Sequence, residues 1–347
     1  MTTAATVRTV GDLQRRAAGL LRAAGLSQAR AERTAQIVVL SEAWGNPSHG
    51  LLRLPYYLTR LAAGGCRADA DLVPVTDTGP IAVFDGQAGI GHWQLWEAAE
   101  IARARCLQSG IAAVGVGNSS HCGALGAYVY PLLDAGLVGL VFSNGPAVMP
   151  PWGGATPLLS TSPVAAGIPS RPTPVVIDLA TSTVARGKIA AYAQAGKELP
   201  EGWALGSDGV PTTDPQLALH GMLAPLGGAK GYALALLVES LTGGLVGPRL
   251  AAEVPDMFDP ADDGKPQGIS HLVIALDPRL FPVEGIGEPG FDRLVTQVQA
   301  SGGRTPGAAR IAPDDLKADT ELSVSAGALE QLDAWAERLG VTPAPQA

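Results

Sequence analysis

The chain has 347 residues, of which 46% are hydrophobic and 16% are charged, and its formal net charge is −8. This length predicts two domains or one elaborated domain. The acidic balance, without any run of Lys or Arg, argues against a nucleic-acid partner. No stretch of about 18 uncharged apolar residues is present, so a membrane span is not expected. Cys66, Cys106 and Cys122 are too few and too scattered for a disulfide framework or a CxxC metal site, which predicts a cytoplasmic protein with reduced thiols and no metal.

The first part of the chain is predicted to be helical. Residues 11–44 carry apolar side chains at a spacing near 3.6, which indicates two amphipathic helices, with Gly25 ending the first and Ser27 capping the second. A further helix is expected from the region of His49 to Leu61. Pro55 falls inside that stretch, so this helix should start or kink near Pro55.

From about residue 72 the pattern alternates between strands and helices. Strands are expected at 81–84, 111–116, 137–142, 175–177 and 272–276, and helices at 93–106, 125–135, 232–243 and 325–340. This order predicts a central α/β domain with a helical domain built from both termini. The Pro- and Gly-rich segment 144–174 is too long for an idle connection and is expected to be functional.

The segment Ser48-His49-Gly50-Leu51-Leu52-Arg53 places an imidazole and a guanidinium four residues apart. On a helix these two side chains would share one face, although Pro55 makes that geometry insecure. A reductase of 2-oxo or 2-imino acids needs a proton donor and a bidentate carboxylate clamp, which His49 and Arg53 can supply. A lone histidine more often bonds backbone groups at a helix start, but Arg53 and the following tyrosines favour the functional interpretation.

Other motifs give weaker predictions. Residues 285–290 match GxGxxG, but they come late, without a strand directly before them and with Pro289 at the helix start, so a surface loop is expected. Residues 118–128 follow a buried strand and open a helix, an arrangement that suits a diphosphate or is simply a capped turn. The sequence holds no HExxH or GxSxG, and its adjacent Ser–His pairs do not predict a hydrolase.

Several further motifs occur in a fixed order: Ser160-Thr161-Ser162-Pro163, Asp178-Leu179-Ala180-Thr181-Ser182, Arg186-Gly187-Lys188 and Pro225-Leu226-Gly227-Gly228-Ala229-Lys230-Gly231. With them, from about residue 10 to 340, the chain resembles the malate/L-lactate dehydrogenase type of NAD(P)-dependent oxidoreductase. That family also holds sulfolactate dehydrogenases and Δ1-piperideine-2-carboxylate/Δ1-pyrroline-2-carboxylate reductases. The resemblance implies an α/β fold, in which a non-Rossmann NAD(P)-binding domain with a mixed, largely antiparallel sheet adjoins a helical domain formed by both termini. It also implies a homodimer.

The domain division implied by the resemblance is 1–75 together with 305–347, for substrate binding and dimerisation, and 76–304, for NAD(P) binding. By motif, Ser48 assists or relays charge, His49 donates the proton and Arg53 binds the substrate carboxylate, with His121 as a rival proton donor. Cofactor contacts are implied for His121, Cys122, Gly123, Ala124, Leu125, Thr161, Asp178, Leu179, Ala180, Thr181, Ser182 and Lys230. The cofactor is NADPH or NADH. Arg186 and Lys188 could meet a 2′-phosphate or be surface charges.

The chain also departs from the family pattern. Ser162 stands where an Asn is usual, Cys122 where a Phe is common, and Ala308 where a Glu often meets the cofactor. Gly123-Ala124-Leu125 leans towards the cyclic imino-acid reductases. The expected function is NAD(P)H-dependent reduction of a 2-oxo acid or a cyclic 2-imino acid. The alternative, motivated by Ala308, is a catalytically impaired homologue that binds a nucleotide or metabolite.

Overall fold

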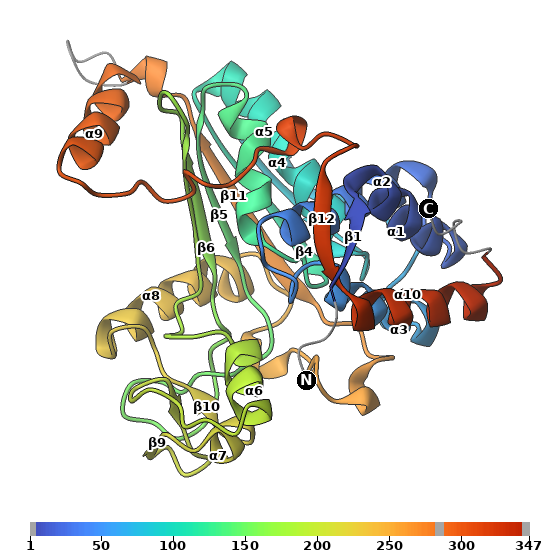
Figure 1. Cartoon of the computed structure of the whole chain (residues 1–347). Coiled ribbons are helices and arrows are strands. Elements are labelled where there is room, and N and C mark those ends of the chain that lie inside the picture. Colours follow the sequence, from blue (N-terminus) through green and yellow to red (C-terminus); the bar gives the residue numbers. More distant parts are fainter. Residues whose placement is uncertain (1–4, 282–287, 342–347) are drawn as a thin grey trace.

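The computed structural model describes residues 5–281 and 288–341, and a seven-stranded sheet lies at its centre (Figure 1). The strand order is β2 (Val73–Thr78), β3 (Ile81–Asp85), β4 (Ile111–Ser119), β11 (Ile269–Leu276), β5 (Val138–Ser143), β6 (Val164–Ile168) and β7 (Val175–Leu179). Only the β3–β4 pair is parallel, and every other neighbouring pair in this sheet is antiparallel. The mixed, largely antiparallel sheet is therefore confirmed.

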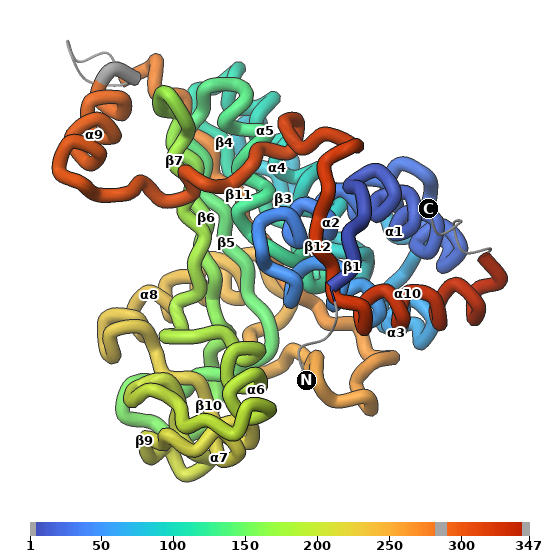
Figure 2. Tube along the Cα trace, in the orientation of Figure 1, coloured from blue at the N-terminus to red at the C-terminus, as the bar shows by residue number. Residues whose placement is uncertain are grey.

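The middle strands are apolar on both faces because both faces are covered. Helix α4 (Gly91–Ser109), a 3₁₀ helix (Leu125–Val129) and α5 (Tyr130–Leu133) pack on one face around a core that includes Leu95, Val114 and Val273. Helix α8 (Ala229–Glu239) and a π-helical turn (Ser240–Gly244) cover part of the other face. Figure 2 shows β5, β6 and β7 side by side above α8.

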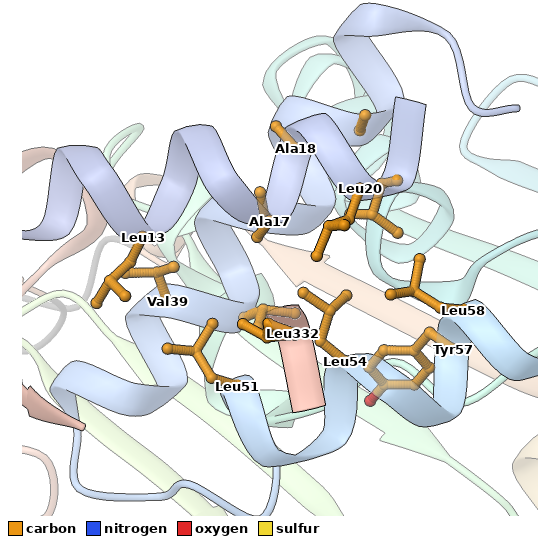
Figure 3. Close-up of a cluster of buried hydrophobic side chains, with 14 of the residues drawn as sticks. Leu13, Ala17, Ala18, Leu20, Val39, Leu51, Leu54, Tyr57, Leu58 and Leu332 are labelled. Atoms are coloured by element: carbon orange, nitrogen blue, oxygen red, sulfur yellow. The ribbon is translucent and has the colours of Figure 1, made fainter. Parts of the chain in front are cut away.

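Both ends of the chain meet in one helical group. Strand β1 (Ala5–Thr9) pairs antiparallel with β12 (Glu321–Ser325), and the blue and red arrows lie side by side in Figure 1. Helices α1 (Val10–Ala23), α2 (Gln28–Ala43), α3 (Leu54–Ala63) and α10 (Ala326–Leu339) enclose a leucine-rich core. Figure 3 shows this core, with Tyr57 on α3 beside it.

A smaller lobe is formed mainly by the chain that follows strand β7, with residues of the connection between β5 and β6 in its core. It holds α6 (Arg186–Gln194), α7 (Pro215–Leu219) and a three-stranded sheet of β10 (Met222–Leu223), β8 (Ala204–Leu205) and β9 (Pro211–Thr212). Met149, Leu159 and Ile189 are among its core residues. The remaining described helices are α9 (Glu288–Ala300) and the 3₁₀ turns Leu51–Arg53, Ala251–Glu253, Pro260–Asp262, Pro278–Leu280 and Pro313–Asp315.

Several local expectations were wrong. The helix expected at 125–135 is a 3₁₀ turn followed by one α-helical turn, since Pro131 and Gly136 leave little room for a longer helix. The segment 144–174, expected to be one long loop, contains strand β6. Glu288–Gly290, expected in a loop, begin helix α9, while Gly285–Gly287 lie outside the described residues. Among the described helices, none has the length and apolar character needed to cross a membrane.

Candidate active site

The turn that carries Ser48, His49 and Arg53 is fixed to helix α2. The Glu42 carboxylate accepts a hydrogen bond from the Leu51 backbone N–H at 2.9 Å, and a Cβ on Gly50 would collide with that carboxylate. Burial raises the pKa of Glu42. His49 lies in a turn and Arg53 ends a 3₁₀ helix, so the expectation of a shared α-helical face is wrong. Pro55 sits in the first turn of α3, where the missing N–H costs nothing.

Hydrogen bonds hold the His49 ring in one tautomer. The Ser48 hydroxyl donates to Asn46 Oδ1 at 2.9 Å, and His49 Nδ1 lies 3.1 Å from Ser48 Oγ and 3.3 Å from Asn46 Oδ1. An amide oxygen only accepts, so Nδ1 carries the proton and Nε2 keeps its lone pair. Asn46 was not predicted, although it lies only three residues before His49.

The His121 ring stacks on His49, with ring centroids 5.6 Å apart. His121 Nδ1 lies 2.8 Å from the Tyr57 hydroxyl and 3.3 Å from the Gly123 backbone nitrogen, whose N–H donates to it. Nδ1 is therefore an acceptor, which places the His121 proton on Nε2. The His121 backbone N–H donates to Gln267 Oε1 at 3.1 Å, which joins the loop after β4 to the segment before β11.

Two further histidines lie behind this pair. His92, near the start of α4, packs edge-on against Tyr57 with centroids 4.7 Å apart, and neither of its buried nitrogens has a partner. His271, in the middle of β11, is within 2.9 Å of Ser143 Oγ and 3.2 Å of Ser119 Oγ through its two nitrogens. Neither residue was predicted as part of the site, because His92 lies at the start of a segment that reads only as a helix and His271 in one that reads only as a buried strand.

All four imidazoles are held neutral near pH 7. Burial, followed by the charge of Arg53, lowers the pKa of His49 to about 4. Burial is also the main cause that lowers the pKa of His92 to about 3, of His271 to about 4, and of His121 well below 6.5. Burial raises the pKa of Tyr57 well above 10, so its hydroxyl stays protonated beside His121. The cluster therefore contains no permanent positive charge other than that of Arg53.

Arg53 lies beside the histidine cluster and is half-buried. Its Nε donates to the Ser48 carbonyl at 3.3 Å, and its guanidinium lies 5.4 Å from the Tyr56 ring centroid. Within the described residues no carboxylate forms an ion pair with Arg53, so four of its five N–H donors face no protein acceptor there. That leaves the planar fork available for an anion.

The structure brings three of the expected cofactor segments together. Thr181 donates to the Thr161 carbonyl through its backbone N–H at 2.9 Å and its hydroxyl at 3.0 Å. Ser182 bridges to Pro225, and the Leu226 N–H donates to the Thr181 carbonyl at 2.8 Å. Lys230 follows in the first turn of α8 and is exposed. Hydroxyls, backbone donors and an ammonium group are chemically suited to ribose and phosphate groups.

Asp178, at the end of β7, has a different environment. Its Oδ2 lies 3.3 Å from Arg310 Nη1, and it also accepts the Gly126 N–H, so β7 is joined to the segment just after Leu125. Burial raises the pKa of Asp178, and Arg310 opposes that rise. Leu179 is 41% exposed and Ala180 is half-buried. Among the described residues the Asp178 carboxylate is thus engaged by protein groups.

The segment from Cys122 to Leu125 passes close to His92. Cys122, Ala124 and Leu125 are buried, and burial raises the pKa of the Cys122 thiol to about 12. Gly123 has φ of 73°, and a Cβ there would come within 2.8 Å of His92 Nε2. Only glycine therefore allows the loop to pass this close to His92. No group of three or more metal-ligating side chains occurs within residues 5–281 and 288–341.

Comparisons with known proteins find matches along most of the chain. Residues 9–332 match the model of a family described as malate/L-lactate dehydrogenase. The chain is 40% identical over 295 residues to a (2R)-3-sulfolactate dehydrogenase (NADP(+)) of Chromohalobacter salexigens, covering 85% of this chain and 87% of that protein. It is 33% identical to a Δ1-pyrroline-2-carboxylate reductase of Agrobacterium fabrum, covering 96% and 97%.

Two solved structures show the same fold. The sulfolactate dehydrogenase of Methanocaldococcus jannaschii superposes with a TM-score of 0.84 at 28% identity, covering 97% of this chain and 98% of that one. The Δ1-piperideine-2-carboxylate reductase of Pseudomonas syringae superposes with a TM-score of 0.82 at 29% identity, covering 97% and 100%. The relatives thus include both hydroxy-acid dehydrogenases and imino-acid reductases.

Proposed function

We propose, from the premise that this chain belongs to the malate/L-lactate dehydrogenase family of NAD(P)-dependent oxidoreductases, that it catalyses the NAD(P)H-dependent reduction of a 2-oxo or 2-imino acid. The observation that carries this proposal is the stacked His49–His121 pair beside an Arg53 that lacks a carboxylate partner among the described residues. A proton donor and a carboxylate clamp are the two protein groups that such a reduction needs.

Arg53 binds the substrate carboxylate. A carboxylate seated on its fork forms two parallel charged hydrogen bonds, which fixes the orientation of the adjacent C=O or C=N group. The Ser48 carbonyl and the Tyr56 ring restrict where the guanidinium can move. The reacting carbon is thereby held at a fixed place relative to the two imidazoles.

Proton transfer takes place at His49 Nε2, the nitrogen that Ser48 and Asn46 leave free. His121, with its proton on Nε2 and Nδ1 held by Tyr57, donates a hydrogen bond to the substrate oxygen or nitrogen. Arg53 lowers the pKa of both rings through its charge. A carboxylate bound to Arg53 offsets that charge and raises both pKa values, so substrate binding itself favours the protonated donor.

The cofactor is held by Thr161, Thr181, Ser182 and Lys230 together with the His121–Leu125 loop, and Asp178, Leu179 and Ala180 support this wall at the end of β7. When bound, the nicotinamide supplies the hydride. The buried, neutral surroundings of His92 and His271 exclude water from the reacting centre. Assays with each of the two cofactors determine whether NADH or NADPH is preferred.

The proposal includes a homodimer and a cytoplasmic location. Leu234, Leu236 and Leu237 on α8 are 49%, 45% and 52% exposed, so α8 presents an apolar surface that a second copy of the chain would bury. All three cysteines are unpaired, as expected for a reducing compartment. The expected domain division, 1–75 with 305–347 against 76–304, is supported by the separate core of the helical group.

The dimer is tested by sedimentation analysis. A double variant, Leu234→Glu with Leu237→Glu, is expected to sediment as a monomer. Leu294→Glu on α9, where the leucine is 56% exposed, serves as the control and should leave the mass unchanged. A monomeric wild-type protein at micromolar concentration would contradict the homodimer.

The activity is tested by following reduced-nicotinamide absorbance with a panel of 2-oxo acids and Δ1-piperideine-2-carboxylate, with each of NADH and NADPH. Turnover should fall about 10²-fold in His49→Gln and about 10³-fold in Arg53→Met. His220→Gln, at an exposed position after α7, should match the wild type. Nicotinamide binding without any turnover would instead establish the alternative, an impaired binding homologue.

A further inference from the structure

Phe258 lies between two arginines that come from different parts of the molecule. Its ring centroid is 5.5 Å from the guanidinium carbon of Arg53 and 4.5 Å from that of Arg186, the first residue of α6. Two carbons at those distances from one point lie at most about 10 Å apart. In Figure 1 the orange segment that carries Phe258 runs between α6 of the small lobe and α3 of the helical group. The small lobe therefore places a cation within about 10 Å of the Arg53 guanidinium.

The support under Phe258 is built into the fold. Arg60 of α3, only 1% exposed, donates to the Asp262 carbonyl at 3.1 Å and also to the Lys265 carbonyl. These bonds tie the loop after Phe258 to the helix that follows Arg53. Phe258 itself is 47% exposed, so part of its side chain is accessible from solvent.

Both arginines keep most of their hydrogen-bonding capacity. Arg186 donates from Nη2 to the Leu219 carbonyl at 3.0 Å, and within the described residues neither Arg186 nor Arg53 has a carboxylate within ion-pair distance. Three carboxylates of the Phe258 loop have hydrogen-bond or ion-pair partners of their own. The Asp256 carboxylate accepts the Phe258 N–H, Asp259 accepts the Ala261 N–H, and Asp262 pairs with Lys265.

Two guanidinium groups this close repel each other unless anions lie between them. A single carboxylate can neutralise Arg53 and leaves Arg186 without a counter-charge. A substrate with an anionic group at each end satisfies both forks, since a planar guanidinium can bind two oxygens of one such group in bidentate fashion. The methylene between the two anionic groups would lie against the Phe258 ring.

We propose that Arg186 binds a second anionic group of the substrate, so that the preferred substrates are dianionic 2-oxo acids carrying a terminal carboxylate or sulfonate. This inference rests on the proposed function and narrows it away from the cyclic imino monocarboxylates. It also assigns Arg186 to the substrate rather than to a 2′-phosphate of the cofactor.

The test compares kcat/KM for matched substrates that differ in charge: oxaloacetate and 3-sulfopyruvate as dianions, and 2-oxobutyrate and Δ1-piperideine-2-carboxylate as monoanions. The wild type should favour the dianions. Arg186→Met should lower kcat/KM for the dianions about 100-fold, mainly through KM, and that for the monoanions less than about 3-fold. Whichever dianion loses more identifies the terminal group.

Lys188→Met removes the same charge from the same helix and is the matched control, because Lys188 faces the Trp203 ring rather than Phe258. It should leave the substrate preference unchanged. Arg186→Lys keeps the charge without the fork and should recover part of the dianion preference.

Three outcomes overturn the inference in an active enzyme: equal losses for monoanions and dianions in Arg186→Met, no loss for either, or a changed ratio of NADPH to NADH affinity in that variant, measured by nicotinamide fluorescence. A wild-type protein that turns over none of the four substrates overturns the proposed function, and this inference with it.

Discussion

The two sides of the candidate site differ in how they hold their polar groups. On the inner side, His49, His121, His92 and His271 are neutral, and burial is the main cause of their lowered pKa values. On the outer side, Arg53 and Arg186 are charged and present unused donors next to Phe258. Under the proposed function, the fixed charges lie where the substrate binds, whereas the titratable groups lie where the charge of the bound substrate changes their protonation.

This arrangement links binding to chemistry. Burial, and to a smaller extent the charge of Arg53, lowers the pKa of His49 and of His121, so both rings are unprotonated in the free protein. An anion at Arg53 removes part of that effect, so protonation of the donor follows substrate binding. The predictions below test each side separately, beginning with the outer one.

The largest effect is expected for Arg53→Met. It removes a bidentate charged contact to the substrate, for which each charged hydrogen bond contributes about 1.5–3 kcal/mol, so kcat/KM should fall about 10³-fold. Arg293→Met on α9, far from α3 in Figure 1, is the control and should retain full activity. An Arg53→Met enzyme within tenfold of the wild type would break the assignment of the outer side.

The second prediction separates the two stacked histidines. With a pKa of about 4 in the free protein, a His49 donor makes kcat/KM for reduction rise about tenfold for each unit of decreasing pH between 8 and 5. His49→Gln should lower the rate about 10²-fold and abolish that slope. His121→Gln should lower the rate while keeping the slope.

The pH profiles of the two variants decide the role of each ring. A slope that persists in His49→Gln and disappears in His121→Gln would reverse the two roles. Parallel slopes in both variants would show that neither ring is the proton donor.

The third prediction concerns the inner side and stability. His92 has a folded-state pKa of about 3 against an ordinary value of 6.5, so the unfolded chain binds the extra proton. The contribution of neutral His92 to the free energy of unfolding is therefore complete above pH 6.5. It is lost as the pH falls from 6.5 towards 3, at about 1.4 kcal/mol per pH unit. When the pH is lowered from 7 to 5, the free energy of unfolding should fall by about 2 kcal/mol less in His92→Phe than in the wild type. Urea denaturation at the two pH values measures this difference.

The exposed His220→Gln variant is the control for this measurement and should follow the wild-type curve. If His92→Phe and the wild type lose the same stability between pH 7 and 5, then His92 does not contribute to acid sensitivity. That result would mean that His92 is not one of the imidazoles that burial keeps neutral on the inner side of the site.

The sequence predicted the fold, the family and the type of enzyme, because ordered motifs run along most of the chain and these expectations are confirmed. His49 and Arg53 were predicted from one short segment, and both lie at the site, although in a turn and a 3₁₀ helix rather than on one helix. Local sequence was sufficient there because one tight turn positions both groups.

The parts that were missed depend on contacts distant in sequence. His271 lies in an apolar run that reads only as a buried strand, and His92 lies in a helix with no periodic signal. The link between Arg186 and Arg53 is made through Phe258, which comes from a third segment. Strand β6 was missed because Gly167 and the flanking prolines hide its short apolar run.

The smallest effect is expected where the cofactor wall meets the core, at the pair Asp178–Arg310. The two side chains are 14% and 27% exposed, and burial raises the pKa of Asp178 despite Arg310. The charged carboxylate is therefore slightly unfavourable in the folded state, so Asp178→Asn should change the unfolding free energy by less than about 0.5 kcal/mol. Arg310→Met leaves a buried carboxylate without its partner and should cost about 1–2 kcal/mol.

The double variant tests whether these effects arise from the pair itself. If they do, combining Asp178→Asn with Arg310→Met restores about 1 kcal/mol of the loss, because no buried charge remains unpaired. Additive losses would mean instead that Arg310 stabilises the fold through its contact with the Trp44 ring, whose centroid lies 4.8 Å from the guanidinium. In that case the charged pair would contribute nothing to stability at the end of β7. The interior there, like that around the four histidines, would then owe no stability to charge.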